Sequence, residues 1–200
     1  MAVSRRFLIA GVPALLLSAC DGGGAKPQFN GVDITGADYA LDLDLNDTDG
    51  KRRHIADFKG KVTVVFFGFT QCPDVCPTTM LELAEVKKAL GADGARVQGV
   101  FISVDPERDT PELLKAYVAN FSPEFVALRG SVEETKAAAK RFKVFYAKVP
   151  GKTEGSYTVD HTAGSYVFDA QGKVRLFVRY GSGAGAEALK HDLQLLLKQG

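Results

Sequence analysis

The chain has 200 residues, of which 46% are hydrophobic and 24% charged, with a formal net charge of +1. This length and hydrophobic content predict one soluble globular domain that can bury a substantial core. A net charge this close to zero argues against nucleic acid as a partner.

The first twenty residues, MAVSRRFLIAGVPALLLSAC, predict an export signal. A pair of arginines precedes an apolar run that is too short for a comfortable membrane span. The end of this stretch, Leu17–Cys20, resembles the lipobox of bacterial lipoproteins. The resemblance implies cleavage before Cys20 and a lipid on its sulfur. We therefore expect a signal peptide over residues 1–19 and a flexible membrane tether over residues 20–36.

Two alternatives for the N-terminus stay open, namely an ordinary signal peptide and a short membrane anchor, with Cys20 incidental in both. The export route, general or twin-arginine, is also open. Asp21 follows the expected lipid site and resembles the signal that retains lipoproteins in the inner membrane. The expected location is the bacterial cell envelope, with the domain facing the periplasm.

Residues 37–200 are expected to form a single domain. Alternating leucines over residues 39–45 predict a first strand. The continuous apolar runs over residues 62–69 and 97–104 predict strands that are buried on both faces. The sequence predicts helices over 78–90, 109–121, 131–142 and 186–198, and further strands over 125–128, 144–149, 163–168 and 174–180. Thr110 and Ser131 are predicted N-caps of the second and third helices.

Strands that alternate with helices predict a parallel core, and the C-terminal hairpin adds antiparallel strands, so the sheet is expected to be mixed. This order resembles a thioredoxin-like α/β fold. Relative to that fold, the chain adds an N-terminal strand and a Gly-rich loop over residues 150–161, before the C-terminal hairpin.

Cys72 and Cys76, in the segment FGFTQCPDVCPTTM, are the two cysteines that remain once Cys20 is assigned to lipid. The pair lies between a predicted strand and a predicted helix. Pro77 disfavours helical geometry at the residue before it, so Cys76 is expected at or before the helix N-terminus. Free N–H groups and the helix dipole stabilise thiolates there, which lowers thiol pKa values.

A pair of thiols at this position fits two kinds of chemistry. It could exchange disulfides, or its thiolates could bind Cu(I), or zinc if further donors converge. A purely structural disulfide is the third alternative, and it would stabilise little because it closes so short a loop. Among the histidines, His54 and His191 lie in polar surroundings, whereas His161 lies between the Gly-rich loop and a strand. Loops at sheet ends are where sites are commonly assembled.

Three segments, GFTQCPDVCPTTM, SVDPERDTP and VDHTAGSYVFD, closely resemble the hallmark segments of the Sco/SenC family. The resemblance extends from Tyr39 to the C-terminus. It implies a thioredoxin fold and a copper ion held by Cys72, Cys76 and His161. It also implies a role in assembling the copper centre of cytochrome c oxidase. The implied partner is the copper-bearing subunit of that oxidase or another copper donor or acceptor protein.

The second of these segments contains Asp105 and Asp109. The family resemblance implies that this segment lies close to the metal loop, where two carboxylates could tune the thiolates or face a cationic partner. Ordinary turn and helix-start chemistry explains both residues equally well.

The sequence therefore predicts a copper chaperone and leaves three other functions open. The first is a thiol–disulfide reductase in which Cys72 attacks and Cys76 resolves the mixed disulfide, with the oxidase's own cysteines as its target. The second is a peroxidase, which would need an arginine beside the cysteine, and none is near in the sequence. The third is a copper sensor with no role in delivery.

Overall fold

The computed structural model describes residues 28–181 and 185–200. The predicted signal peptide and the predicted lipidation site, Cys20, lie outside the described residues. Within the stretch that was expected to be a tether, Val32 and Asp33 form the first described strand. This strand pairs with the last strand of the chain, which spans Val174–Arg179. In the described part of the chain, no helix is both long and apolar enough to cross a membrane.

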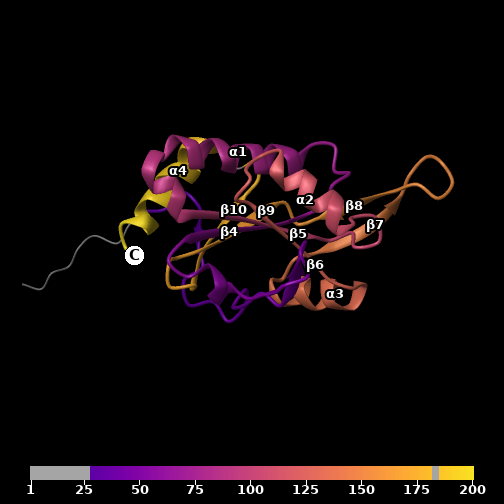
Figure 1. The fold of residues 1–200 in the computed structure, drawn as a ribbon, viewed down its shortest axis with the longest axis horizontal. Helices are drawn as coiled ribbons and strands as arrows, with labels where there is room; N and C mark the ends of the chain where they lie inside the picture. Colours follow the sequence, from indigo (N-terminus) through magenta and orange to yellow (C-terminus); the bar gives the residue numbers. More distant parts are fainter. Residues whose placement is uncertain (1–27, 182–184) are drawn as a thin grey trace, which may run out of the picture.

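An eight-stranded mixed sheet forms the centre of the fold, in the order β1-β10-β9-β4-β5-β6-β2-β3 (Figure 1). Its strands are β1 (Val32–Asp33), β2 (Leu45–Asp47), β3 (Arg52–Arg53), β4 (Val62–Gly68), β5 (Val97–Ser103), β6 (Val126–Arg129), β9 (Gly164–Phe168) and β10 (Val174–Arg179). The three strands β4, β5 and β6 are parallel, and the other pairings are antiparallel. Every residue of β4 and β5 is buried, as the continuous apolar runs predict.

Helices cover both faces of this sheet. They are α1 (Val75–Ala89), α2 (Pro111–Ala119), α3 (Val132–Arg141) and α4 (Gly185–Leu197), with short 3₁₀ turns η1 (Ile55–Phe58) and η2 (Gly91–Arg96). Figure 1 shows α1, α2 and α4 on one face and α3 on the other. The predicted caps are confirmed, since the side chains of Thr110 and Ser131 each accept a hydrogen bond from the first turn of their helix. The predicted mixed α/β architecture is therefore confirmed.

The strand expected over residues 39–45 is wrong in position. Only Leu45 belongs to a strand, β2, which ends at Asp47. Ala40 adopts a left-handed backbone conformation with φ of 53°, which interrupts any extended run. Leu41 is 61% exposed, whereas Leu43 and Leu45 are buried. Burial therefore alternates with period two only from Asp42 onward, and not over the whole predicted strand.

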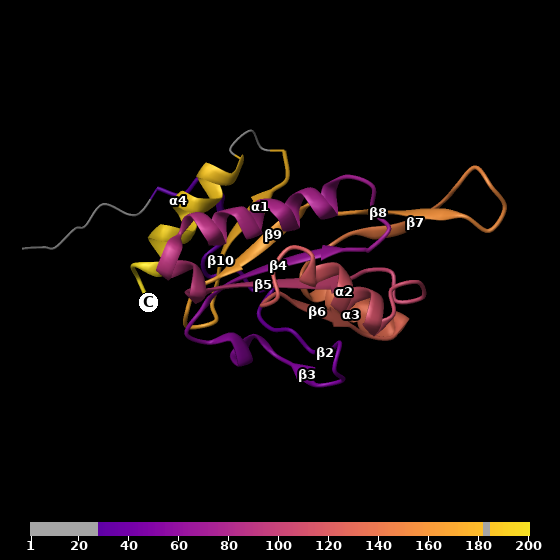
Figure 2. The same cartoon turned by 45° about the horizontal axis from the view of Figure 1, so that its top comes forward.

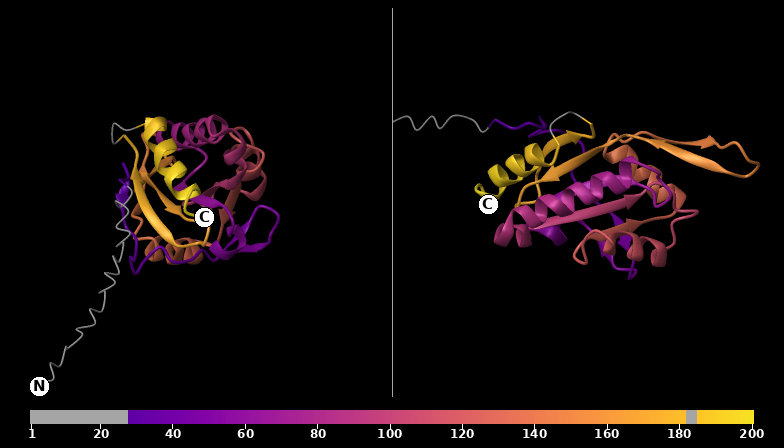
Figure 3. Two further views of the ribbon diagram at one scale, coloured as in Figure 1. Left: turned by 90° about the vertical axis from the view of Figure 1, so that its left-hand side faces the viewer. Right: turned by 90° about the horizontal axis from the view of Figure 1, so that it is seen from above.

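The Gly-rich stretch over residues 150–161 is a β-ribbon where a loop was expected. Strands β7 (Tyr146–Pro150) and β8 (Tyr157–His161) pair antiparallel and form a separate two-stranded sheet. The ribbon projects from the body of the molecule (Figure 2, and Figure 3, right). His161 is therefore the last residue of a strand, and the ribbon determines where its side chain lies.

Candidate metal centre

Cys72 lies in the short loop that joins β4 to α1. Its backbone N–H donates to the carbonyl of Phe69, which turns the chain immediately after the buried strand. The side chain is half-buried, so its sulfur is accessible from the surface. Cys72 is thus placed at the carboxyl end of a central parallel strand, where α/β proteins commonly build their sites.

Cys76 is the second residue of α1, because the helix begins three residues before the predicted start at residue 78. The helix begins at Val75 because Asp74 is the N-cap residue and its carbonyl accepts from the N–H of Thr78. Pro77 falls in the first turn, where its missing N–H breaks no intrahelical hydrogen bond. Cys76 is fully buried.

His161 reaches the cysteines from the end of β8. Its Nε2 lies 3.4 Å from Sγ of Cys76, and its Nδ1 lies 3.1 Å from the carbonyl oxygen of Thr162. With the proton on Nδ1, that nitrogen donates to Thr162 and Nε2 presents a lone pair to the sulfurs. The imidazole stands edge-on to the rings of Phe66 and Phe69, at centroid distances of 5.8 and 6.0 Å.

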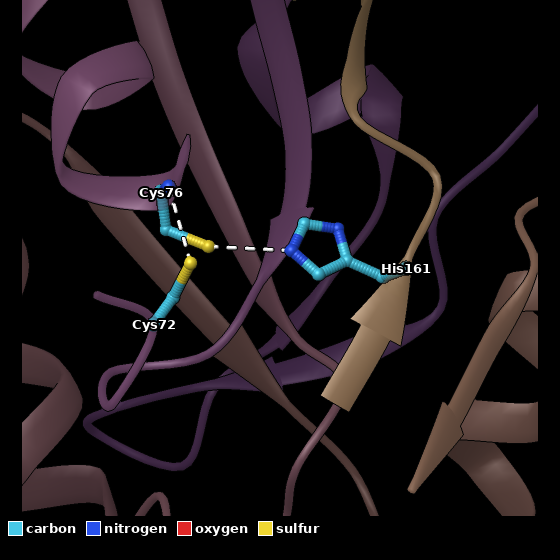
Figure 4. Close-up of side chains that lie close together, drawn as sticks. All are labelled: Cys72, Cys76 and His161. Atoms are coloured by element: carbon cyan, nitrogen blue, oxygen red, sulfur yellow. Dashed lines mark hydrogen bonds between the residues drawn. The ribbon is translucent and has the colours of Figure 1, made fainter. Parts of the chain in front are cut away.

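The three side chains converge on one point (Figure 4). One ligand atom from each of Cys72, Cys76 and His161 can be chosen so that all three lie within 4.8 Å of one another. This separation is close to twice a metal–donor bond of ~2.0–2.3 Å. The two cysteines come from one stretch, the β4–α1 loop and the first turn of α1, and His161 comes from the ribbon, so two segments 85 residues apart in sequence meet here.

The two sulfurs differ in their electrostatics. A hydrogen bond from Cys76 lowers the pKa of Cys72 to about 5, and backbone N–H groups of Asp74 and Cys76 add to this effect. The N–H of Cys76 lies 3.4 Å from the Cys72 sulfur, as expected for the free donors of a helix N-terminus. The hydrogen bond to Cys72 and burial raise the pKa of Cys76. Cys72 is therefore the thiolate of the pair, and Cys76 is the buried thiol.

Asp109 contacts the cysteine loop without touching the sulfurs. Its carboxylate accepts from the backbone N–H of Thr70 at 3.2 Å, from the Thr70 hydroxyl at 2.6 Å and from the Ser103 hydroxyl at 2.6 Å. Asp109 is fully buried, and this burial raises the pKa of its carboxyl. Asp109 thus ties the loop to the end of β5.

Asp105 faces the ribbon. It accepts hydrogen bonds from the Tyr157 hydroxyl at 2.8 Å and from Nε of Arg108. The prediction that the acidic segment lies close to the metal loop thus holds through Asp109 and through Arg108, whose Nη1 reaches the Gln71 side chain at 3.2 Å. An effect of either carboxylate on the thiolates stays a prediction.

The other two histidines lie apart from this site. His54 contacts Asp42 and the carbonyl of Leu43, and His191 contacts Asn30 and Asp192. Sequence reasoning missed four residues that shape the site, namely Gly68, Thr70, Arg108 and Tyr157. Arg108 had a detectable signal, because it lies within the acidic segment three residues after Asp105.

A site of two sulfurs and one imidazole has a definite chemistry. Thiolate and imidazole donors suit Cu(I) and, with further donors, zinc. Two adjacent sulfurs, one of them a thiolate, can also reduce a disulfide, because one sulfur attacks it and the other resolves the mixed disulfide. Both cysteines are free thiols in the structure.

The comparisons with known proteins agree with this geometry. The model of the SCO1/SenC family matches residues 33–198. An SCO2-like protein of Rickettsia felis is 37% identical over 169 residues, covering 83% of this chain and 82% of the relative.

Two solved structures are similar throughout the domain. ScoI of Bradyrhizobium japonicum, solved with copper bound, is 40% identical with a TM-score of 0.68, covering 78% of this chain and 97% of that one. Apo Sco1 of Thermus thermophilus is 39% identical with a TM-score of 0.76, covering 86% and 99%. Because the family match spans most of the sequence, the chain belongs to the SCO1/SenC family.

Proposed function

We propose that this protein is a copper chaperone that binds copper through Cys72, Cys76 and His161 and passes it on during assembly of the copper centre of cytochrome c oxidase. The observation that carries the proposal is the convergence of two sulfurs from one stretch with an imidazole that lies 85 residues further along the chain. Membership of the family and the likeness to a copper-bound ScoI support the choice of copper. The copper-bearing subunit of the oxidase is the proposed recipient.

Copper transfer by ligand exchange follows from the burial of the donors. Cys72 and His161 are half-buried and Cys76 is fully buried, so an incoming thiolate meets the metal from the side of Cys72 and His161. His161 is the only neutral donor of the three, and it can be displaced while both sulfurs hold the ion. The copper ion therefore moves without being released into solution.

The proposal is tested by titrating Cu(I) into the fully reduced protein in competition with a chelator of known affinity. The wild type should bind one Cu(I) per chain. His161→Ala should weaken binding by more than the roughly 10–100-fold loss that is typical for an outer-shell partner. His54→Ala, a histidine that contacts Asp42 outside the site, is the matched control and should bind as the wild type does. Absence of binding by the reduced wild type would overturn the proposal.

A second function, thiol–disulfide reduction, is favoured by the contrast between the two sulfurs. The pKa of Cys72 is lowered to about 5 by its hydrogen bond from Cys76, so this half-buried sulfur is a thiolate at neutral pH. It would attack a target disulfide, and Cys76 would then attack Cys72 and release the target as a dithiol, leaving this pair oxidised. His161→Ala separates the two functions, because a reductase keeps most of its dithiol chemistry without the imidazole.

We also propose that the domain is held at the periplasmic side of the bacterial inner membrane by a lipid on Cys20, after removal of residues 1–19. The lipobox-like sequence before Cys20 and the neighbouring Asp21 support this placement.

A further inference from the structure

Arg108 joins three parts of the chain that surround the proposed copper site. Its Nε donates to Asp105 in the same turn. Its Nη1 donates to the backbone carbonyl of Tyr157 at 2.8 Å and to the side-chain oxygen of Gln71 at 3.2 Å. Gln71 directly precedes Cys72, and Tyr157 lies in β8, the strand that ends at His161. One guanidinium therefore bonds to the residue before Cys72 and to the first residue of the strand that ends at His161.

Stacking reinforces these hydrogen bonds. The guanidinium carbon of Arg108 lies 3.6 Å from the centroid of the Tyr157 ring, well within the range of a cation–π contact. The Tyr157 hydroxyl donates to Asp105 at 2.8 Å, so Asp105, Arg108 and Tyr157 form a closed triangle. The Asp105 side chain is 1% exposed and the Arg108 side chain 21%. Such a sheltered, charge-assisted network is sensitive to loss of any member.

The ribbon is joined to the body by polar contacts of this kind and by the packing of Val159 into the core. Strand β8 pairs with β7 alone and has no partner in the eight-stranded sheet. Besides Arg108, the polar links from the ribbon to the body include an ion pair between Lys148 and Glu107, both about half exposed. Exposed ion pairs contribute little to stability. Among these links, the Arg108 network is the sheltered one.

We propose that Arg108 is a positioning residue that holds His161 at the distance from the cysteine loop that metal binding requires. The inference rests on the proposed copper-binding function for its link to affinity. In this arrangement Arg108 touches no metal ligand. It fixes the ribbon through Tyr157 and the loop through Gln71, so the sulfurs and the imidazole keep their relative places before metal arrives.

A double-mutant cycle in the full-length protein separates positioning from other effects of the same charge. Arg108→Ala should weaken Cu(I) binding about 10-fold, the lower end for outer-shell partners. Arg108→Lys keeps the positive charge but loses the planar fork, and it should show a similar loss. In a His161→Ala background, Arg108→Ala should change the affinity less than about twofold, because the imidazole through which it acts is gone.

Arg175 supplies the matched control. It forms a comparably sheltered ion pair with Asp169, with side chains 17% and 6% exposed, and its other side-chain partners are Thr35 and Gln199. Arg175→Ala should leave the affinity unchanged. An equal loss for Arg108→Ala with and without His161, or a full rescue by Arg108→Lys, would show an electrostatic effect and overturn the proposal.

Hydrogen exchange of the metal-free, reduced protein provides an independent readout. Backbone amides of Tyr157–His161 should exchange faster in Arg108→Ala than in the wild type, and Arg175→Ala should not accelerate them. If Arg108→Ala does not fold, Tyr157→Phe, which keeps the ring and loses only the hydroxyl, should show the same change to a smaller degree. Unchanged exchange in the folded variant overturns the positioning role. Failure of the wild type to bind copper would overturn the proposed function alone.

Discussion

Cys72 and Cys76 differ in burial and in thiol pKa, although they lie in one motif in which a proline follows each cysteine. Cys76 is buried against β4, and its thiol donates to Cys72, whose sulfur also receives the first N–H groups of α1. These interactions lower the pKa of Cys72 to about 5 and raise that of Cys76. At neutral pH the pair therefore carries one negative charge, located on the accessible sulfur.

This asymmetry predicts how many protons copper displaces. Above pH 5, Cys72 has already lost its proton, whereas Cys76 keeps its proton until metal replaces it. Binding of Cu(I) at pH 7 should therefore release about one proton, and the apparent affinity should rise about tenfold per pH unit from pH 6 to 8. Calorimetry in buffers of different ionisation enthalpy measures this number. Release of two protons would contradict the low pKa of Cys72.

Gly68 leaves room for the buried sulfur. A Cβ at this position would lie 2.8 Å from Sγ of Cys76, and also 2.8 Å from the ring of Phe66. Gly68→Ala should therefore displace Cys76 and weaken copper binding, and it should destabilise the fold by about 1–3 kcal/mol, as overpacking does. Denaturant unfolding and Cu(I) competition measure the two effects.

Gly99 is the control for this substitution. It lies in the neighbouring strand β5, and a Cβ there would meet the ring of Phe125 at 2.7 Å, with no sulfur among its nearest atoms. Gly99→Ala should cost comparable stability and leave the copper affinity unchanged. Equal losses of affinity in both variants would mean that crowding in the core, and not the displaced sulfur, weakens binding.

At the scale of elements, the start of α3 depends on a reciprocal cap. The Ser131 hydroxyl accepts from the N–H of Glu134, and the Glu134 carboxylate accepts from the N–H of Ser131. Ser131→Ala should lower the free energy of unfolding by about 1 kcal/mol. The helix lies on the sheet face opposite α1, so copper affinity should not change (Figure 1). A loss of affinity would indicate that α3 is coupled to the site.

Local signals predicted the elements whose structure is decided locally. Continuous apolar runs marked β4 and β5, and cap residues marked the starts of α2 and α3. The first strand of the ribbon, β7, was predicted over residues 144–149. The second, β8, was missed because the glycines and polar residues before it resemble a loop, and Val159 is its one buried residue. The start of α1 was misplaced because a proline in a helical first turn tolerates a helical residue before it, as Cys76 shows.

The residues of the site also divide into those that local signals predicted and those that they did not. Cys72 and Cys76 were evident from their spacing and from the predicted strand and helix around them. His161 is 85 residues from Cys76 in sequence, and the spacing alone favoured it only weakly until the family resemblance was added. The contact between Arg108 and Tyr157 could not be predicted, because it exists only once the ribbon folds back over the acidic segment.

For the whole molecule, the start of the domain packs against α4. Asn30 and Gly31 are held by Asp192 of α4. The ribbon projects from the other end of the body (Figure 3, right). A lipid on Cys20 would therefore leave the tip of the ribbon directed away from the end of the domain at which the lipid is attached.

The proposed anchor makes a prediction in cells. Cys20→Ser removes the sulfur that would carry lipid, so the protein should move from the membrane fraction to the periplasmic fraction if the signal is still cleaved, or keep its signal sequence if it is not. Fractionation and mass spectrometry of the N-terminus distinguish these results. An unchanged, membrane-bound mature N-terminus at residue 20 would contradict lipid attachment.

The central claim is that two sulfurs and one imidazole hold a single copper ion. X-ray absorption of the Cu(I)-loaded, reduced protein tests it most directly, because the method counts the donors by element. We predict two sulfur donors and one imidazole nitrogen in the wild type, and the same two sulfurs without the nitrogen in His161→Ala. A copper site with no imidazole in the wild type, or an unchanged imidazole signal in His161→Ala, would contradict the account.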